Sequence, residues 1–384
     1  MEYIVVNARV VAPSGVIGQG WVHVKEGRIA AVGEMAAELP AAERIDARGS
    51  WLVPGFVDVH VHGGANHDFM DASEDGIRAI TKFHAENGTT SMLATTLTAS
   101  REDLTAVIAL VADYMSKPMP YARLVGVHLE GPFVNAKWKG AQNPAYILPP
   151  QPDWLEDWVS RYPGVIKLQT LAPEIEGSLD YIEKLAGHGI VPACGHTDAT
   201  YDQIVAAADR GLKHAVHTFN AMTPLHHRQP GTVGAVLTDD RIAAEVIADG
   251  HHVHPAGVKL ITRAKGAHNV ILVTDAMSAA GMPDGDYELG GLPVRMTCGV
   301  ARLKENDSLA GSTLTMISAF RYLVREIGVP VEEASRMASA NAARQLGLDG
   351  EIGAIEAGKR ADFLLLDDSL GLLSTWIGGR RLGE

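Results

Sequence analysis

The chain has 384 residues, of which 46% are hydrophobic and 21% charged, a composition typical of a folded globular protein. Its 33 basic and 46 acidic residues give a formal net charge of -13, which argues against nucleic acid or an anionic membrane as a partner. Two cysteines are too few for a disulfide scaffold. The sequence has neither a secretory leader nor an apolar run of about 18 residues, so we expect a cytoplasmic protein without a membrane span.

Both ends of the chain are rich in β-forming residues. Short strands are predicted at 3–6, 21–24 and 28–32, with turn signals between them, and again at 361–367 and 375–377. We therefore expect a small β-sandwich domain built from both termini, residues 1–53 and 350–384. The remaining residues, 54–349, would form the catalytic domain.

The central part of the sequence alternates between apolar runs and helical stretches. Helices are predicted at 73–87, 101–114, 178–187 and 201–211, among others. Strands are predicted at 52–61, 89–97, 124–129, 165–171, 190–193, 214–218, 242–248 and 270–274. Eight such strands favour an α/β fold of the (β/α)8 TIM-barrel type. A doubly wound open sheet also alternates, but its GxGxxG and GxxxxGK[ST] nucleotide motifs are absent.

Histidines and carboxylates gather at the carboxyl ends of the predicted strands, where a TIM barrel has its active site. Imidazole and carboxylate together form a ligand set for Zn²⁺ or Fe²⁺, and a carboxylate can bridge two ions. The sequence therefore predicts a metal site. The residues at these strand ends are His60, His62, His128, Glu130, His196, His214, His217 and Asp275.

Other histidines carry less information. A lone histidine is more often a structural residue than a ligand, and His23, His84, His188 and His268 are interpreted so. His128 has two interpretations: it orients Glu130, or it fills the barrel interior.

Several segments resemble a known family. Residues 54–63, PGFVDVHVHG, and 353–362, GAIEAGKRAD, resemble segments of the amidohydrolase superfamily. Further blocks narrow the resemblance to the N-acetylglucosamine-6-phosphate deacetylase family, and they appear in that family's order over nearly the whole chain. These blocks are 128–133 HLEGPF, 195–199 GHTDA, 217–222 HTFNAM, 248–253 ADGHHV, 274–277 TDAM and 310–314 AGSTL.

The resemblance implies a specific metal centre. One ion would be held by Glu130, His196 and His217, and a second by His60 and His62, with Glu130 as a bridge. Some relatives lack the first HxH motif and use one metal, whereas this sequence keeps it. We therefore expect one or two divalent ions, Zn²⁺ or Fe²⁺, beside Asp275, which would be the catalytic acid and base and a further metal ligand.

The resemblance also implies a substrate and an assembly. The expected reaction is hydrolysis of the acetamide of N-acetyl-D-glucosamine 6-phosphate, giving acetate and the amino sugar phosphate. Arg228 and His252 would bind the phosphate, which in the family can involve the neighbouring subunit of a dimer. A homodimer is therefore expected. The remaining expected substrate-binding residues are Gln142, Asn220 and Ala221.

One position departs from the family pattern. Many members have a histidine, thought to contact the acetyl carbonyl, where this sequence has Gln142 in the segment KGAQNP. The glutamine amide can donate a hydrogen bond but supplies no positive charge.

Other functions therefore stay open. They are deacetylation of N-acetylgalactosamine 6-phosphate or of another acylated amine, a cyclic-amide hydrolase, and a non-catalytic protein on the same barrel. A non-catalytic protein would be expected to have lost metal ligands. The sequence also has no lysine at the end of the fourth predicted strand that could be carbamylated, which disfavours a dihydroorotase-like enzyme.

Overall fold

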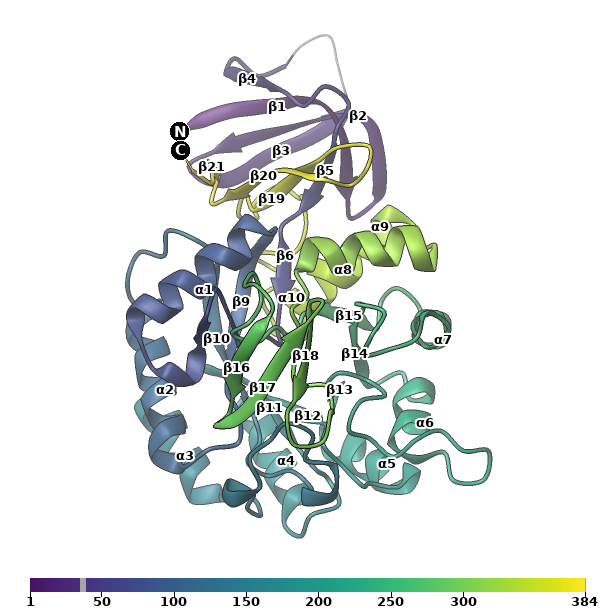
Figure 1. The fold of residues 1–384 in the computed structure, drawn as a ribbon. Helices are drawn as coiled ribbons and strands as arrows, with labels where there is room; N and C mark the ends of the chain where they lie inside the picture. Colours follow the sequence, from purple (N-terminus) through teal and green to yellow (C-terminus); the bar gives the residue numbers. More distant parts are fainter. Residues whose placement is uncertain (35–38, 384) are drawn as a thin grey trace.

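The two ends of the chain meet in one mixed sheet, at the top of Figure 1. The structure, a computed structural model, describes residues 1–34 and 39–383. Residues 35–38 and 384 of the predicted sheet domain lie outside the described residues, and the boundaries of that domain stay a prediction. The sheet consists of β1 (Glu2–Ala12), β2 (Gly15–Lys25), β3 (Arg28–Glu34), β4 (Glu43–Asp46), β5 (Trp51–Pro54), β19 (Phe363–Leu366), β20 (Leu372–Ile377) and β21 (Arg380–Arg381).

Alternating apolar side chains hold this sheet together. Val22 and Val24 of β2 are buried on the same face, as the two-residue period of a strand requires. Their cluster includes Phe363 and Trp376, whose rings stack 5.5 Å apart. The predicted union of the two termini is therefore confirmed.

The second sheet is the predicted barrel. All of its neighbouring strands pair in parallel, in chain order from the first to the eighth. Its strands are β6 (Phe56–Asp58), β9 (Thr89–Thr95), β10 (Arg123–Glu130), β11 (Ile166–Leu171), β12 (Val191–Cys194), β13 (His214–Ala215), β14 (Ala243–Ile247) and β15 (Val270–Val273).

The barrel closes between its first and last strands through side-chain and backbone bonds. The backbone N–H of Asp275 donates to the carbonyl of His60 at 2.8 Å. The Thr274 hydroxyl donates to the buried carboxylate of Asp58 at 2.6 Å. Burial raises the pKa of Asp58 to about 7, against the lowering effect of these hydrogen bonds. The seam thus lies directly beneath His60 and Asp275.

The prediction of one strand over 52–61 is wrong. β5 belongs to the sheet of the termini, and β6 starts the barrel after a break at Gly55. The backbone N–H of Gly55 donates to the carbonyl of Asp362 at 2.9 Å. A Cβ on Gly55 would lie 2.2 Å from Oγ1 of Thr90, so no side chain fits where the chain crosses between the sheets.

Helices surround the barrel, and local sequence signals define their ends. Ser73 and Ser100 each accept a backbone N–H from the first turn of the helix that follows, and Thr200 forms a capping box with Gln203. The predicted helices are confirmed within about two residues. The α-helices are α1 (Glu74–Glu86), α2 (Arg101–Met115), α3 (Pro152–Arg161), α4 (Ser178–Gly187), α5 (Tyr201–Asp209), α6 (Gly231–Thr238), α7 (Pro255–Lys265), α8 (Met316–Tyr322), α9 (Val331–Ser335) and α10 (Asn341–Gln345).

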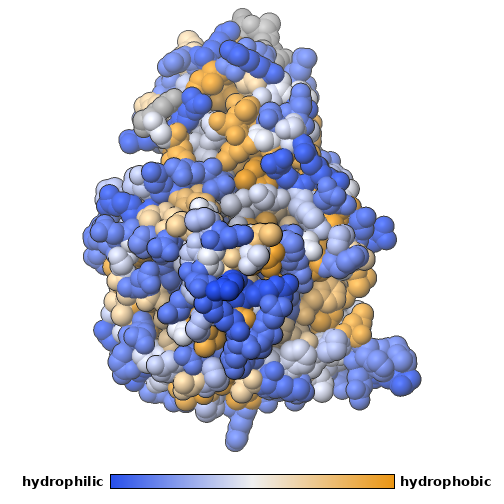
Figure 2. Space-filling view, in the orientation of Figure 1, coloured by the Kyte–Doolittle hydropathy of each residue, from blue (hydrophilic) through white to orange (hydrophobic). Residues whose placement is uncertain are grey.

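An antiparallel sheet follows the eighth barrel strand and was not predicted. It consists of β16 (Gly285–Leu289), β17 (Leu292–Thr297) and β18 (Val300–Leu303) and lies in front of the barrel in Figure 1. Hydrophilic side chains gather over its outer face (Figure 2). Its inner face packs on Leu97 and Met277. A short hairpin, β7 (Gly63–Gly64) and β8 (His67–Asp68), follows the first barrel strand. No helix within the described residues is long and apolar enough to cross a membrane.

Candidate metal centre and active site

Glu130 lies at the centre of the predicted metal site. It is the last residue of β10 and is 2% exposed. Its Oε1 is 3.2 Å from Nε2 of His196 and 3.0 Å from Nε2 of His217. Its Oε2 is 3.4 Å from Nε2 of His62. The two carboxylate oxygens therefore face different histidines, which is the arrangement of a carboxylate that bridges two ions.

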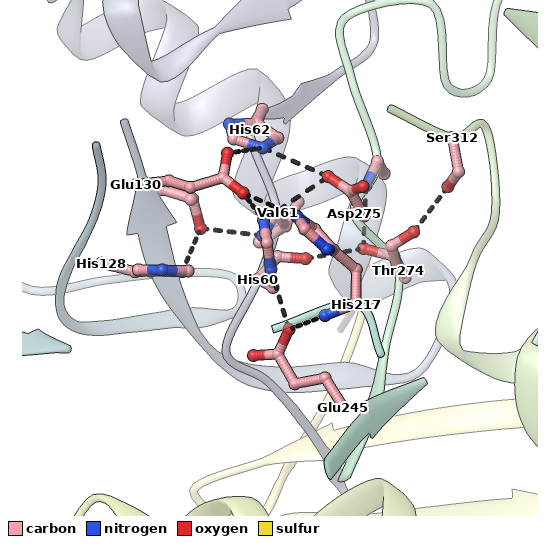
Figure 3. Close-up of polar contacts among 12 residues, drawn as sticks. His60, Val61, His62, His128, Glu130, His217, Glu245, Thr274, Asp275 and Ser312 are labelled. Carbon is pink, nitrogen blue, oxygen red and sulfur yellow. Dashed lines mark hydrogen bonds and ion pairs between the residues drawn. The ribbon is translucent and has the colours of Figure 1, made fainter. Parts of the chain in front are cut away.

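The second half of the site contains the HxH motif and Asp275 (Figure 3). Oδ1 of Asp275 is 3.2 Å from Nε2 of His62 and 3.6 Å from Nε2 of His60. Nε2 of His60 is also 3.3 Å from Oε1 of Glu130. The structure thus brings together all six residues predicted as metal ligands.

Left-handed backbone directs several of these side chains into the barrel mouth. His196, His217 and Asp275 have φ angles of 47°, 30° and 52°. Each follows the end of a barrel strand by two residues. Positive φ is uncommon outside glycine and clusters at functional sites, where the surrounding structure pays for the strain.

The electrostatics of the site favour bound positive charge. Burial alone would lower the pKa of His62, but hydrogen bonds to Asp275 and Glu130 raise it to about 9. Burial opposes ionisation of Glu130, yet His60 and the other imidazoles hold the pKa of Glu130 well below its ordinary value. The protein atoms alone thus keep Glu130 ionised and attract protons to His60 and His62. A divalent cation supplies the same positive charge.

The donor set fits a metal ion. Two groups have all their ligand atoms within 4.8 Å of one another: His60, Glu130 and His217, and His60, His62 and Asp275. Nε2 of His60 is buried and, among the described residues, has no hydrogen-bond partner. Nδ1 of His196 donates to the carbonyl of Trp138 at 2.8 Å, which leaves its Nε2 as an acceptor. Imidazole lone pairs and carboxylate oxygens directed at one point are the ligands of a Zn²⁺ or Fe²⁺ site.

Two buried residues behind the ligands have different roles. His128 bonds to the carbonyl of Val59 at 3.1 Å and to Thr170 at 2.8 Å. Both of its ring nitrogens are thus used by Val59 and Thr170, so His128 fills the barrel interior and does not orient Glu130. Glu245, which the sequence analysis missed, bonds to the ring of His60 at 2.9 Å. Its signal was available, because it is the single charged residue in the apolar run 242–248.

Gln142 lies at the site but has partners of its own. Its Oε1 accepts the backbone N–H of Thr98 at 2.7 Å, which fixes the orientation of the amide. Its Nε2 then donates to Oε2 of Glu130 at 2.6 Å. One N–H of the Gln142 amide is thus used by the carboxylate of Glu130, and only its second N–H is available to a substrate.

A cavity of about 390 Å³ opens above the metal site. Asn220, Ala221 and His252 line it together with five of the six predicted ligands, whereas His60 is fully buried beneath it. Nδ1 of His252 is 2.6 Å from Oδ2 of Asp249, a second residue that sequence reasoning missed. The sheet β16–β18 and the segment after it add Leu289, Leu309 and other residues to the wall.

Arg228 is the predicted site residue that lies apart. It is exposed on the loop before α6, where its Nη1 is 2.6 Å from Nε2 of His227. It is not among the residues that line the cavity of its own chain. This loop projects from the barrel in Figure 1.

Cys194 is buried within the barrel, and burial raises the pKa of its thiol to about 12. Such a thiol carries no nucleophilic role at neutral pH.

This barrel with its histidine and carboxylate centre belongs to the amidohydrolase family, whose sequence model matches residues 51–382. The chain is 39% identical over 380 residues to an N-acetylglucosamine-6-phosphate deacetylase of Lysinibacillus sphaericus, covering 99% of this chain and 97% of the relative. It is 40% identical over 363 residues to an N-acetylgalactosamine-6-phosphate deacetylase of Escherichia coli O157:H7, covering 94% and 96%.

The similarity extends to solved structures. A mutant N-acetyl-D-glucosamine-6-phosphate deacetylase of Mycobacterium smegmatis, in complex with N-acetyl-D-glucosamine-6-phosphate, superposes with a TM-score of 0.94. The two sequences are 36% identical, and the superposition covers 99% of both chains. Within the amidohydrolase family, the chain therefore groups with the amino sugar 6-phosphate deacetylases.

Proposed function

We propose that the protein hydrolyses the acetamide of N-acetyl-D-glucosamine 6-phosphate to D-glucosamine 6-phosphate and acetate, using divalent metal. The observation that carries this proposal is the position of Glu130. One of its oxygens faces His196 and His217 and the other faces His62, at the floor of a cavity that also contains Asp275. The named relatives that the chain resembles over nearly its full length support the substrate class.

In this proposal Glu130, His196 and His217 would hold one ion, and His60 and His62 would hold a second together with Glu130. When bound, a divalent ion polarises a carbonyl oxygen and lowers the pKa of water to about 7, so that a nucleophile forms at neutral pH. Zn²⁺ and Fe²⁺ both suit these ligands.

Asp275 moves the proton. Burial opposes its ionisation, but the contacts with His60 and His62 lower its pKa in the metal-free protein, and a bound cation would favour the same ionised form, so it starts as a carboxylate. It accepts a proton from the attacking water as the C–O bond forms, and then donates that proton to the amide nitrogen as the C–N bond breaks. An amine leaves readily only when protonated, so one carboxyl group serves both steps. The second N–H of Gln142 would donate a hydrogen bond that stabilises the developing negative charge on the carbonyl oxygen.

The sugar phosphate would lie toward the mouth of the cavity. His252, whose Nδ1 lies 2.6 Å from Oδ2 of Asp249, is the group of the same chain that we assign to the phosphate, with Asn220 and Ala221 beside the sugar. Arg228 has the planar fork that suits phosphate oxygens but lies outside its own cavity. We therefore propose a homodimer in which this loop reaches the cavity of the partner. A cytoplasmic location stays a prediction of the sequence alone.

A second candidate substrate is N-acetylgalactosamine 6-phosphate, because one relative at 40% identity is named for it. Gln142, in place of the histidine expected from the family resemblance, also keeps other acylated amines open.

The deciding experiment measures acetate and primary-amine release from both sugar phosphates and from unphosphorylated N-acetylglucosamine, before and after chelation. We expect chelator-sensitive activity that is highest on N-acetylglucosamine 6-phosphate and returns when Zn²⁺ or Fe²⁺ is added. Higher kcat/KM on the galacto isomer would favour the second candidate. No release from any of these compounds by folded, metal-loaded protein would refute the proposal.

A further inference from the structure

Glu245 is a buried carboxylate beneath the metal centre. It lies in the middle of β14, and its side chain is completely inaccessible to solvent. In Figure 3 it lies on the side of His60 opposite Glu130 and Asp275. An ionised carboxylate at such a position must be satisfied by hydrogen-bond donors, because burial without them is costly.

Three donors meet this carboxylate, and none belongs to a lysine or arginine. Its Oε2 is 2.9 Å from Nδ1 of His60 and accepts the backbone N–H of His217 at 3.1 Å. Its Oε1 is 2.7 Å from Nε2 of His214. One side chain from the seventh barrel strand thus contacts His60 after the first strand, His214 within the sixth strand and His217 after it.

These contacts determine which nitrogen of His60 can bind a metal. An ionised carboxylate only accepts hydrogen bonds, so Nδ1 of His60 carries the hydrogen that faces Glu245. Nε2 then presents its lone pair to the site, 3.3 Å from Oε1 of Glu130 and 3.6 Å from Oδ1 of Asp275. His60 is also the one residue common to both potential ligand groups.

We infer that Glu245 is a positioning residue for the metal centre, which fixes Nε2 of His60 as a ligand atom and holds the backbone of His217 beside it. The inference rests on the proposed metal-dependent function. Partners that hydrogen-bond the far nitrogen of a ligand histidine set its tautomer and raise its basicity, and their loss weakens metal binding about 10- to 100-fold.

The test is Glu245→Gln, which keeps the shape of the side chain but removes its charge. When the amide NH₂ faces His60, the hydrogen of His60 must move to Nε2, which then cannot bind a metal. When the amide oxygen faces His60, the NH₂ group faces Nε2 of His214, whose hydrogen must then move to Nδ1, a buried atom without a hydrogen-bond partner among the described residues. We expect Zn²⁺ affinity, measured by competition with a chromophoric chelator, to fall about 10- to 100-fold. The thermal melting of the metal-free protein reports separately on folding.

Thr170→Val is the matched control. It removes the bond from Thr170 to His128 in the same buried layer, without touching His60 or Glu245. We expect it to lower the melting temperature while Zn²⁺ affinity stays within about twofold of wild type. Glu245→Asp is the milder variant, in case the glutamine variant does not fold. It keeps the charge but shortens the reach by one methylene, and its affinity should also fall.

The outcomes distinguish the positioning role of Glu245 from the metal-dependent function on which it rests. Wild-type Zn²⁺ affinity in a folded Glu245 variant, or an equal loss in Thr170→Val, would overturn the positioning role. Wild-type protein that binds no divalent ion would instead refute the proposed metal-dependent function.

Discussion

Asp275, the proposed acid and base, has an unusual backbone conformation. Its left-handed conformation is held by two backbone bonds, from its own N–H to His60 and from the N–H of Ser312 to its carbonyl at 2.7 Å. The side chain therefore enters the cavity with little freedom, which suits a group that must accept a proton and return it.

We predict that Asp275→Asn lowers kcat by about 10²- to 10⁴-fold, because the amide cannot accept the proton of the attacking water. The metal content per subunit should stay near that of wild type, since the histidines and Glu130 remain. Steady-state kinetics and elemental metal analysis of the same preparation provide the measurement. Near-wild-type kcat in the variant would remove Asp275 from the mechanism.

Gln142 acts on Glu130 as well as facing the cavity. We predict that Gln142→Ala weakens metal affinity about tenfold, because the bridging carboxylate loses a donor at 2.6 Å. The value of kcat should fall as well. If kcat falls while metal affinity is unchanged, the amide acts on the substrate alone.

The sequence predicted best those residues whose role follows from their position next to a predicted strand. His60, His62, Glu130 and Asp275 follow apolar runs, so the barrel hypothesis alone brings them to one rim. Glu245 and Asp249 were missed because their roles depend on which ring nitrogen of another residue they face. The left-handed backbone at His196 and His217 was also not foreseen, since neither residue is a glycine and tertiary bonds impose the conformation.

Individual elements show where local signals sufficed and where they failed. Serine and threonine caps fixed the starts of α1, α2 and α5. The run 52–61 has continuous β character, but the sheet that each half joins depends on tertiary partners: β5 pairs with β1 and β19, and β6 pairs with β9. The sheet β16–β18 was missed because its strands are short and largely exposed on one face.

The crossing between the two sheets gives a prediction at this scale. Gly55→Ala should lower the free energy of unfolding by about 1–3 kcal/mol, because the new Cβ would collide with buried Thr90. Gly187→Ala, at the end of α4, is the control, since nothing lies within 4 Å of its Cβ. Thermal unfolding of both variants tests this, and equal melting temperatures would contradict it.

Helix α1 is joined to the first barrel loop by His84. Its Nε2 donates to the carbonyl of Gly63 at 2.9 Å, and burial lowers the pKa of His84 to about 4. The folded protein thus keeps His84 neutral, while the unfolded chain binds a proton below about pH 6.5. Its contribution to stability is present above that pH and is lost as the pH falls toward 4.

We therefore predict that wild type loses about 2 kcal/mol more unfolding free energy between pH 7 and pH 5 than His84→Gln does. Urea unfolding of both proteins at the two pH values measures the difference. Parallel losses would show that His84 does not titrate as its burial implies.

The whole molecule is expected to act as a dimer, and this leads to a mixing experiment. Arg228→Ala and Asp275→Asn should each be nearly inactive at low substrate concentration. If Arg228 serves the partner, a mixed dimer contains one site with both residues intact. Random exchange of the two variants should then restore about a quarter of wild-type activity, since half of the dimers are mixed and each has one complete site. No recovery after exchange would show that Arg228 serves its own chain or no site.

The segment between Met277 and Ser312, which contains β16–β18, leaves the barrel and returns to it at almost the same place. The backbone N–H of Met277 donates to the carbonyl of Ser312, and Ala276 pairs with Ser312 in a parallel bridge. The backbone bonds that hold Asp275 thus lie at the base of this loop and involve only His60 and Ser312. Leu289 and Leu309, within the loop, form part of the cavity wall. Evolution can therefore lengthen, shorten or replace this segment and change which acyl group or sugar is accepted, while the chemistry below is inherited intact.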